Sequence, residues 1–226
     1  MSESSNFAVD NFAYVPNFAE SSVVSAVSKY ALLKEAYSFN PDTKQVINAH
    51  AVYADFLMES LLLDYKEKVE KITGLSLIPT YSFYRVYRRG QELTPHIDRP
   101  ACEVSVSVCY EYDYQGKDYE WPLVMGDTPI VMSPGDGAIY KGMEVNHFRP
   151  IFNVPQNSYH IQGFYHYVDA NGPWTSHAYD KRENSHLTII EKKIKQPALS
   201  VKEKYEQYRA DEAVAFVQNM RKQTNI

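Results

Sequence analysis

The spacing of hydrophobic positions changes near residue 75, and this change divides the chain into a helical part and a strand-rich part. In Glu20–Tyr37 the apolar residues recur at intervals of three and four, which predicts a helix that ends before Asn40-Pro41-Asp42. Asp55 can cap a second helix, which is predicted over residues 56–73 and ends at Gly74. The first third of the chain is therefore expected to supply supporting helices.

After Gly74 the pattern becomes that of short strands. Runs rich in β-branched and aromatic residues are separated by Gly, Pro and Asp, with no helical stretch between them. Many short strands in succession favour a sandwich or a jelly roll. The predicted strands are Leu75–Ile78, Tyr81–Tyr87, Val104–Tyr110, Pro122–Met125, Ile130–Met132, Gly137–Lys141 and Tyr159–Val168.

Both ends of the chain are predicted to be attached to this β core. Polar and apolar positions alternate in residues 1–18, which predicts an extended arm laid on the domain. Near the other end, Leu187–Ile194 is predicted as a last strand and Val201–Lys222 as a charged helix. We therefore predict one domain in three parts: residues 1–74 as arm and supporting helices, 75–180 as the core, and 181–226 as a strand and helix extension.

Charge and cysteine content narrow the setting of the protein. The net charge is −5 and no stripe of Lys and Arg stands out, so we expect no general binding to nucleic acid. Cys102 and Cys109 lie in one predicted strand with side chains on opposite faces, so they cannot pair with each other, and we expect a reducing compartment. The N-terminus lacks a signal-peptide pattern and no apolar run reaches about 18 residues. We expect a cytoplasmic protein with no membrane span.

The candidate chemistry lies at His96 and Asp98, which form an H-x-D pattern between two predicted strands. In a strand, residues i and i+2 point to the same face, so both side chains can reach one metal ion. His147 follows a Gly-Asp-Gly turn and a further predicted strand, and it can complete a set of two histidines and one carboxylate. Such a set suits non-haem Fe(II) and leaves coordination positions open. The alternative is that His96 and Asp98 form an ordinary surface hydrogen-bonding pair.

Three blocks of the sequence resemble a known family. SFYRVYRRGQELTPHIDRP, SPGDGAIYKGMEVNHFR and QGFYHYVDANGPW are similar to the Fe(II)- and 2-oxoglutarate-dependent oxygenases, in particular to the branch of prolyl 4-hydroxylases and their bacterial and phage relatives. The resemblance spans residues 74–174. It implies a mainly β fold with flanking helices (α+β), built on a double-stranded β-helix core of the jelly-roll or cupin type. His96, Asp98 and His147 match the metal triad of the family position by position.

The resemblance also implies an activity. The expected reaction is hydroxylation of an unactivated C–H bond in a peptidyl substrate, such as a prolyl residue, or in a small molecule, with O2 and release of succinate and CO2. Ascorbate would be a supporting reductant, and a homo-oligomer is compatible with the pattern. Asp98 favours hydroxylation over halogenation, since a small residue there would free a site for halide. Two alternatives stay open: a metal-dependent enzyme on the same barrel that does not use 2-oxoglutarate, and a non-catalytic β-sandwich binding module.

The cosubstrate site departs from the family pattern. Members hold the far carboxylate of 2-oxoglutarate with an Arg or Lys at the start of the strand that follows the second metal histidine. Counted back from the end of that strand, the position falls on His160. Arg149 and Arg85 are rival anchors, because a buried carboxylate needs a charged partner. A further hydrogen bond could come from Tyr84 or Tyr87.

Three further features each have two interpretations. Arg99 either clamps the substrate or forms a salt bridge with Glu92 or Glu103. His166 is predicted to be a core histidine bonded to a backbone carbonyl rather than a ligand. The acidic, aromatic segment 111–121 is either a lid over the site or a solvated hairpin loop.

Overall fold

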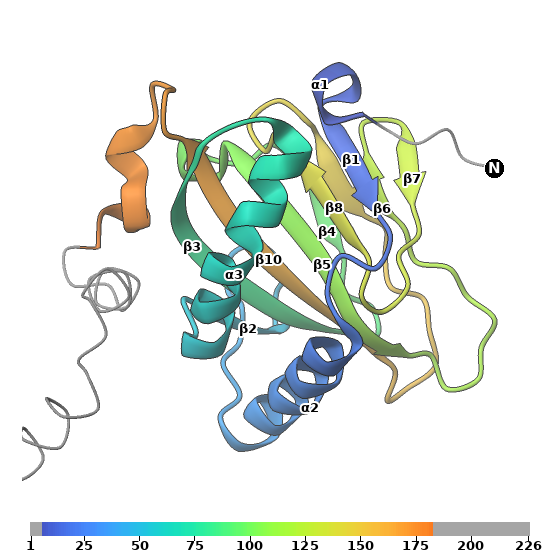
Figure 1. Cartoon of the computed structure of the whole chain (residues 1–226). Coiled ribbons are helices and arrows are strands. Elements are labelled where there is room, and N and C mark those ends of the chain that lie inside the picture. The colour runs from blue at the N-terminus through green and yellow to red at the C-terminus, as the bar shows by residue number, and fades with distance from the viewer. Residues whose placement is uncertain (1–5, 183–226) are drawn as a thin grey trace, which may run out of the picture. The chain divides into compact units, whose positions relative to one another are not determined.

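Two antiparallel sheets form the core of the computed structural model, which describes residues 6–182 (Figure 1). The larger sheet has the strand order β1-β8-β5-β10-β3-β2, and the smaller sheet has the order β4-β9-β6-β7. Side chains from both sheets meet in one buried cluster, in which Cys109 and Ala138 of the larger sheet pack with Leu123 and Met125 of the smaller. The strands are β1 Phe12–Val15, β2 His50–Tyr53, β3 Leu77–Arg88, β4 Leu93–His96, β5 Val104–Asp113, β6 Leu123–Met125, β7 Thr128–Ile130, β8 Gly137–Tyr140, β9 His147–Arg149 and β10 Tyr159–Asp169.

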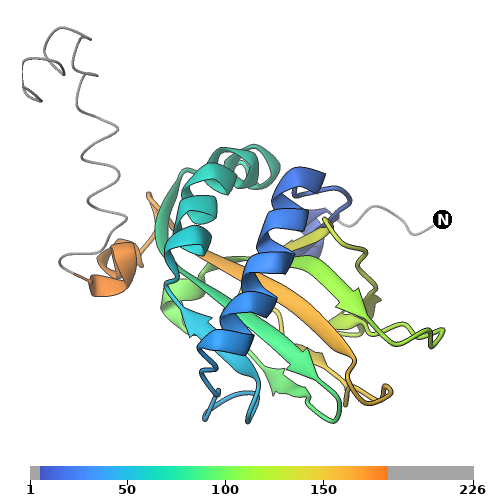
Figure 2. The same cartoon turned by 90° about the horizontal axis from the view of Figure 1, so that it is seen from below.

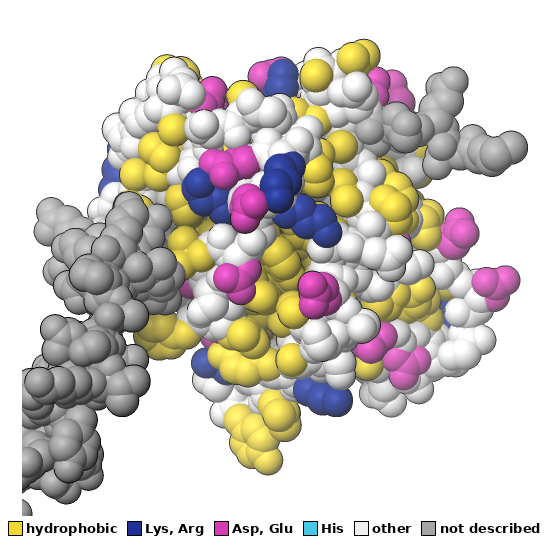
Figure 3. Space-filling model, in the orientation of Figure 1, with side chains coloured by type: hydrophobic (Ala, Val, Ile, Leu, Met, Phe, Trp, Pro, Cys, Tyr) yellow, Lys and Arg dark blue, Asp and Glu magenta, His cyan; other side chains and the backbone are white. Residues whose placement is uncertain are grey.

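Two long helices, α2 (Ser21–Tyr37) and α3 (Phe56–Thr73), cover the outer face of the larger sheet (Figure 2). The ends of α3 are those predicted, because the Asp55 side chain accepts a hydrogen bond from the Leu57 N–H and Gly74 adopts a left-handed conformation with φ 74°. Over this face, Lys, Arg and acidic side chains lie beside one another (Figure 3). On α3, Lys66 forms an ion pair with Glu70 and Lys71 with Glu67. The short helices are α1 (Phe7–Asp10), η1 (Pro100–Cys102) and η2 (Thr175–Lys181).

The paired strands β3 and β10 run the length of the larger sheet and present alternate residues to its two faces. Tyr81, Phe83 and Arg85 of β3 line a cavity between the sheets. The residue between the first two, Ser82, points to the helices, where its N–H donates to the fully buried carboxylate of Glu59 on α3 at 2.8 Å. This alternation decides which of the predicted site residues can reach the cavity.

The strand-rich core is confirmed, but several boundaries differ from the prediction. One strand, β3, replaces the two predicted strands Leu75–Ile78 and Tyr81–Tyr87. A bulge at Thr80 lets its pairing with β10 continue to Pro79. A proline is tolerated there because, among the described residues, β3 pairs at this point with β10 alone. The predicted strand Ile130–Met132 is instead Thr128–Ile130. Four short strands were absent from the predicted set: β1, β2, β4 and β9.

The arm and the cysteines also differ in detail. Residues 7–10 form α1, and residues 12–15 form β1, which pairs with β8 at the edge of the larger sheet. Cys102 lies in η1 rather than in a strand with Cys109, and both thiols are free and buried. Among the described residues no helix is long and apolar enough to cross a membrane. The predicted strand 187–194 and helix 201–222 lie outside the described residues.

Candidate metal centre and its pocket

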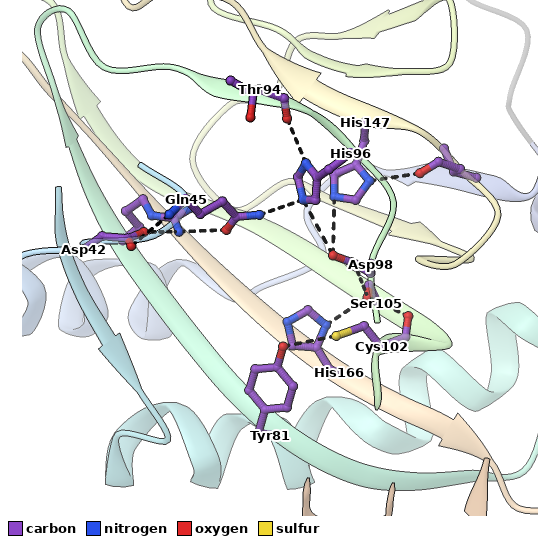
Figure 4. A network of polar contacts seen from close by, with 12 residues as sticks. Asp42, Gln45, Tyr81, Thr94, His96, Asp98, Cys102, Ser105, His147 and His166 are labelled. Atoms are coloured by element: carbon purple, nitrogen blue, oxygen red, sulfur yellow. Dashed lines mark hydrogen bonds and ion pairs between the residues drawn. The ribbon is translucent and has the colours of Figure 1, made fainter. Parts of the chain in front are cut away.

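Strands β4 and β9 bring the predicted triad together. The two strands are antiparallel, with His96 at the end of β4 opposite His147 at the start of β9. Asp98 follows β4, and its Oδ1 lies 3.7 Å from Nε2 of His96 and 3.9 Å from Nε2 of His147. Figure 4 shows the three side chains pointing toward one another, and one ligand atom from each lies within 4.8 Å of the others.

The hydrogen bonds of the two histidines set which ring nitrogen faces the centre. Nδ1 of His96 lies 2.9 Å from the Thr94 carbonyl oxygen, and Nδ1 of His147 lies 3.0 Å from that of Val145. A carbonyl only accepts, so each Nδ1 carries a proton and each Nε2 presents a lone pair toward Asp98. Burial lowers the pKa of both histidines, which keeps the rings neutral, and raises the pKa of Asp98 to about 6. Two neutral imidazoles and one carboxylate fit a divalent metal ion.

Gly142 holds the carboxylate of this set in place. The Asp98 N–H donates to the Gly142 carbonyl at 2.8 Å. A Cβ at position 142 would lie 2.7 Å from Oδ2 of Asp98 and 2.2 Å from the Cys102 carbonyl oxygen. Sequence reasoning missed this residue, although a glycine in the run before His147 was a visible sign of a close approach.

The triad opens into a cavity of about 390 Å³ between the two sheets. One wall is aromatic, and polar groups approach it from the strands and from the loop between α2 and β2. A volume of this size suits a small molecule or a single side chain. The lining residues are Gln45, Tyr53, Tyr81, Phe83, Arg85, Leu93, His96, Ile97, Asp98, Arg99, Cys102, Tyr140, His147, Phe164 and His166.

Gln45 is a site residue that no sequence pattern indicated. Its Nε2 lies 2.8 Å from Nε2 of His96, and its Oε1 accepts a hydrogen bond from the Arg85 guanidinium at 3.0 Å. The same guanidinium forms a buried salt bridge with Asp42 at 2.7 Å. The 42–45 loop therefore lies against the metal-ligating face of His96 (Figure 4).

Arg149 is a buried cation with no acidic partner among residues 6–182. It is two residues beyond His147 on β9, and its side chain is 2% exposed. Its guanidinium donates to the Trp121 carbonyl at 2.8 Å and to Oε1 of Gln162 at 3.0 Å, and both of these acceptors are neutral. Burial lowers the pKa of Arg149, because a charged guanidinium is unfavourable away from water when no carboxylate of the described residues lies beside it.

The structure places His160 in the same interior but in a neutral setting. Its Nε2 bonds to Oε1 of Gln162 at 2.9 Å and its Nδ1 to the Tyr114 hydroxyl at 2.9 Å. Gln162 uses its own N–H to donate to Ser107 at 2.8 Å, so its oxygen accepts from His160 and from Arg149 alike. Burial and the nearby Arg149 hold the pKa of His160 well below its ordinary value. At neutral pH this ring is uncharged, which is unfavourable for binding a carboxylate.

The remaining cosubstrate candidates divide between the two faces of β3. Tyr84 points to the helices, where its hydroxyl lies 3.2 Å from Nε2 of His50, outside the cavity. Tyr87 points into the barrel and accepts a hydrogen bond from Arg85 at 3.0 Å. Nε of Arg85 is buried without a hydrogen-bond partner among the described residues.

Two partner predictions were wrong. Arg99 pairs with Asp180 of η2, at 2.6 and 2.8 Å, rather than with Glu92 or Glu103, because η2 brings this acid to the mouth of the cavity. His166 bonds through Nδ1 to the Ser105 hydroxyl at 2.9 Å, not to a backbone carbonyl, and its ring lines the cavity.

None of the described residues that line the cavity belongs to the segment 111–121. Tyr114 and Trp121 are buried with Phe152 in an apolar cluster whose members Leu93 and Phe164 also line the cavity. The position of the segment therefore fits the loop alternative rather than a lid.

The sheet order and the donor set together define the fold class. A six-stranded and a four-stranded antiparallel sheet, with the triad between them, form a double-stranded β-helix with flanking helices, as predicted. No model of a protein family and no curated protein sequence matches the chain. Solved structures do match it, and they are prolyl hydroxylases and other 2-oxoglutarate–Fe(II) oxygenases, as the resemblance predicted.

Three of these structures illustrate the range. A prolyl 4-hydroxylase from Pseudomonas putida is 15% identical with a TM-score of 0.54, over 71% of this chain and 94% of that one. The epimerase SnoN of nogalamycin biosynthesis, in complex with Fe3+, α-ketoglutarate and nogalamycin RO, is 12% identical with a TM-score of 0.58, over 73% and 81%. A Trichoplax adhaerens prolyl hydroxylase, in complex with a hypoxia-inducible-factor peptide fragment, is 13% identical with a TM-score of 0.53, over 72% and 86%. At these identities the likeness establishes the fold.

Proposed function

We propose that the protein is an Fe(II)- and 2-oxoglutarate-dependent dioxygenase that hydroxylates a C–H bond of a peptidyl or small-molecule substrate. The observation that carries the proposal is the convergence of the His96, Asp98 and His147 ligand atoms on one point, with both imidazoles neutral. Iron held there would supply the activation of O2, coupled to conversion of 2-oxoglutarate into succinate and CO2. The chain's own residues bind, orient and enclose the reactants.

Arg149 is our candidate for holding the far carboxylate of 2-oxoglutarate. It shares a strand face with His147, about 6.6 Å further along β9, which is comparable to the length of a five-carbon diacid that chelates a metal at one end. The carboxylate would offset the charge of Arg149, whose hydrogen-bond acceptors among the described residues are both neutral. Gln162 and His160 then act as the hydrogen-bonded support of this arginine.

Arg85 is less suited to this role. Asp42 already neutralises its charge in a buried ion pair, and its two terminal nitrogens also donate to Gln45 and Tyr87, which leaves Nε without a partner among the described residues. Breaking such a pair to accommodate a second carboxylate would leave Asp42 buried without its partner. We assign Arg85 to the support of the 42–45 loop.

The reacting carbon of the substrate would enter along the aromatic wall of Tyr53, Tyr81, Phe83 and Phe164. These rings can enclose an apolar ring or side chain and exclude water from the metal-facing end. Among the solved structures of similar fold, one is in complex with a peptide fragment and another with nogalamycin RO. The cavity size is compatible with either substrate class.

An anaerobic titration tests the function without knowledge of the substrate. Fe(II) and then 2-oxoglutarate are added to the apo-protein, and the weak visible band of a chelated keto acid is recorded. We expect the band in the native protein and its loss in His147→Ala. Bound iron without a band would favour a metal enzyme that does not use 2-oxoglutarate, and no binding of iron would favour the non-catalytic module.

A further inference from the structure

The side chain of Gln45 competes for the nitrogen that a metal ion would use. Its Nε2 approaches Nε2 of His96 at 2.8 Å, while Nδ1 of His96 is committed to the Thr94 carbonyl. Nε2 of a neutral imidazole has a single lone pair. The hydrogen bond from Gln45 and a bond to a metal ion therefore exclude each other.

Arg85 fixes which end of the Gln45 amide faces the histidine. A guanidinium only donates, so the atom it contacts at 3.0 Å must be the amide oxygen. The amide N–H groups are thereby directed to His96, which offers an acceptor there. Arg85 thus donates to Gln45, and Gln45 donates to His96. The charge of Arg85 also polarises the Gln45 amide.

The backbone around Gln45 is anchored, which limits how the amide can move. The Asp42 carboxylate accepts hydrogen bonds from the N–H groups of Lys44, Gln45 and Val46, at 2.9, 3.1 and 3.1 Å. Val46 is 1% exposed and belongs to the buried cluster that contains Tyr87 and Leu93. The amide can therefore leave His96 by rotation of its own side chain, while it stays within reach of the metal centre.

We propose that Gln45 is a positioning residue of the metal centre with two successive partners. Without metal its amide donates to Nε2 of His96. With metal bound, the same N–H would donate to the carboxylate of a chelating 2-oxo acid. This inference rests on the metal site of the proposed function.

Two opposite effects follow from this proposal. The apo-state hydrogen bond weakens metal binding, and the hydrogen bond in the loaded state strengthens binding of the 2-oxo acid. A residue that only fills space would not shift both constants, and not in opposite directions.

The test measures two dissociation constants in turn. Redox-inert Co(II) is titrated into the apo-protein, and 2-oxoglutarate is then titrated into the Co(II)-loaded protein, each followed by the visible Co(II) spectrum. In Gln45→Ala we expect Co(II) to bind about three- to tenfold more tightly, and 2-oxoglutarate to bind about three- to tenfold more weakly, since one hydrogen bond is lost at each stage.

Two further variants and a control sharpen the test. Gln45→Asn keeps the amide but is one methylene too short to reach His96 from the anchored loop, so it should behave like Gln45→Ala. Gln45→Glu replaces the N–H donors by a carboxylate, which can add to the metal ligands, so Co(II) should bind more tightly still and 2-oxoglutarate more weakly. Lys44→Ala, an exposed neighbour, should leave both constants at the native values.

Several results would overturn the inference. Constants for Gln45→Ala within twofold of the native values would do so, and so would a change of both in the same direction. A native protein that binds no Co(II) would remove the metal site, and with it the proposed function. A native protein that binds Co(II) and 2-oxoglutarate, with a silent Gln45→Ala, would remove this inference alone.

Discussion

In the proposed function, Arg149 is the residue that holds the cosubstrate. Replacing it by Met keeps most of the volume and removes a desolvated charge, so we expect Arg149→Met to fold with a Tm equal to or above that of the native protein. Loss of a buried charged partner should weaken 2-oxoglutarate binding by about 100-fold or more. Titration of the visible band of the Fe(II) complex measures this constant.

Arg85→Met is the matched comparison for that prediction. It removes a second arginine of the same barrel but leaves Asp42 without its ion pair, so its main effect should be a lower Tm. If 2-oxoglutarate binding were retained in Arg149→Met and lost in a folded Arg85→Met, the anchor would be Arg85.

The addition of one methyl group at Gly142 should disturb the candidate metal centre. In Gly142→Ala the added Cβ meets both the Asp98 carboxylate and the Cys102 carbonyl, so the carboxylate and the backbone around it must shift from their present positions. We expect Fe(II) or Co(II) to bind more than about tenfold more weakly, since one of three ligands is displaced. Gly137→Ala is the control, because its Cβ would meet the Phe18 ring at 2.9 Å and should lower the Tm with the metal constant unchanged.

Some residues of the candidate site could be predicted from the sequence, and others could not. The H-x-D spacing and the distant His147 could be predicted as a metal set, because period and family pattern both point to them. Gln45 and Gly142 carry no such pattern, since their roles depend on contacts with His96 and Asp98 that only the folded chain creates. His160 could be placed in the interior by counting, but its neutrality follows from burial, which a sequence does not display.

At the scale of elements, α3 is joined to the sheet by a buried carboxylate. Glu59 is fully buried and accepts hydrogen bonds from the Ser82 N–H and hydroxyl, at 2.8 and 2.9 Å, and from Arg182 at 3.0 Å. We expect Glu59→Ala to lower the free energy of unfolding by about 3–5 kcal/mol, because these donors lose their acceptor. Urea denaturation followed by circular dichroism measures the change.

A second acidic residue of the same helix provides the control. Glu67 is exposed and pairs with Lys71 one turn away, so Glu67→Ala should leave the free energy of unfolding close to that of the native protein. Equal effects of the two substitutions would contradict the role assigned to Glu59.

Several of the long elements could be predicted from the sequence. The two long helices have enough turns for their apolar stripes and caps to be visible, and β5 and β10 have enough residues for strand composition to show. The short strands β4 and β9, which deliver the two histidines, owe their existence to pairing across the barrel. The two histidines of the site therefore lie on strands that the sequence pattern did not predict.

At the scale of the whole molecule, three distant parts of the chain meet at the mouth of the cavity. The Asp180 carboxylate binds Arg99 through two hydrogen bonds and accepts one from the Tyr53 hydroxyl at 2.5 Å. We expect Asp180→Ala to lower the free energy of unfolding by about 1 kcal/mol at neutral pH, because Arg99 is half exposed.

The pH dependence of this effect follows from the pKa of Asp180. Burial alone would raise the pKa, but the hydrogen bonds from Arg99 and Tyr53 outweigh it and hold the pKa below the ordinary value of 3.8. The contribution is thus fully present above the pKa of the unfolded chain and is lost as the pH falls through the folded value. The stability difference between Asp180→Ala and the native protein should shrink below about pH 4; a difference that grew on acidification would contradict this assignment.

The position of Arg149 has a bearing on how such chains are found in genomes. Some search patterns for this oxygenase fold would require Lys or Arg at the start of the final strand. Such a pattern would not detect this chain, because position 160 is a histidine. On our assignment the charge lies instead on β9, the preceding strand in the sequence, which belongs to the other sheet, two residues after the second metal histidine. A pattern that accepts the cation on either strand would retrieve chains of this kind.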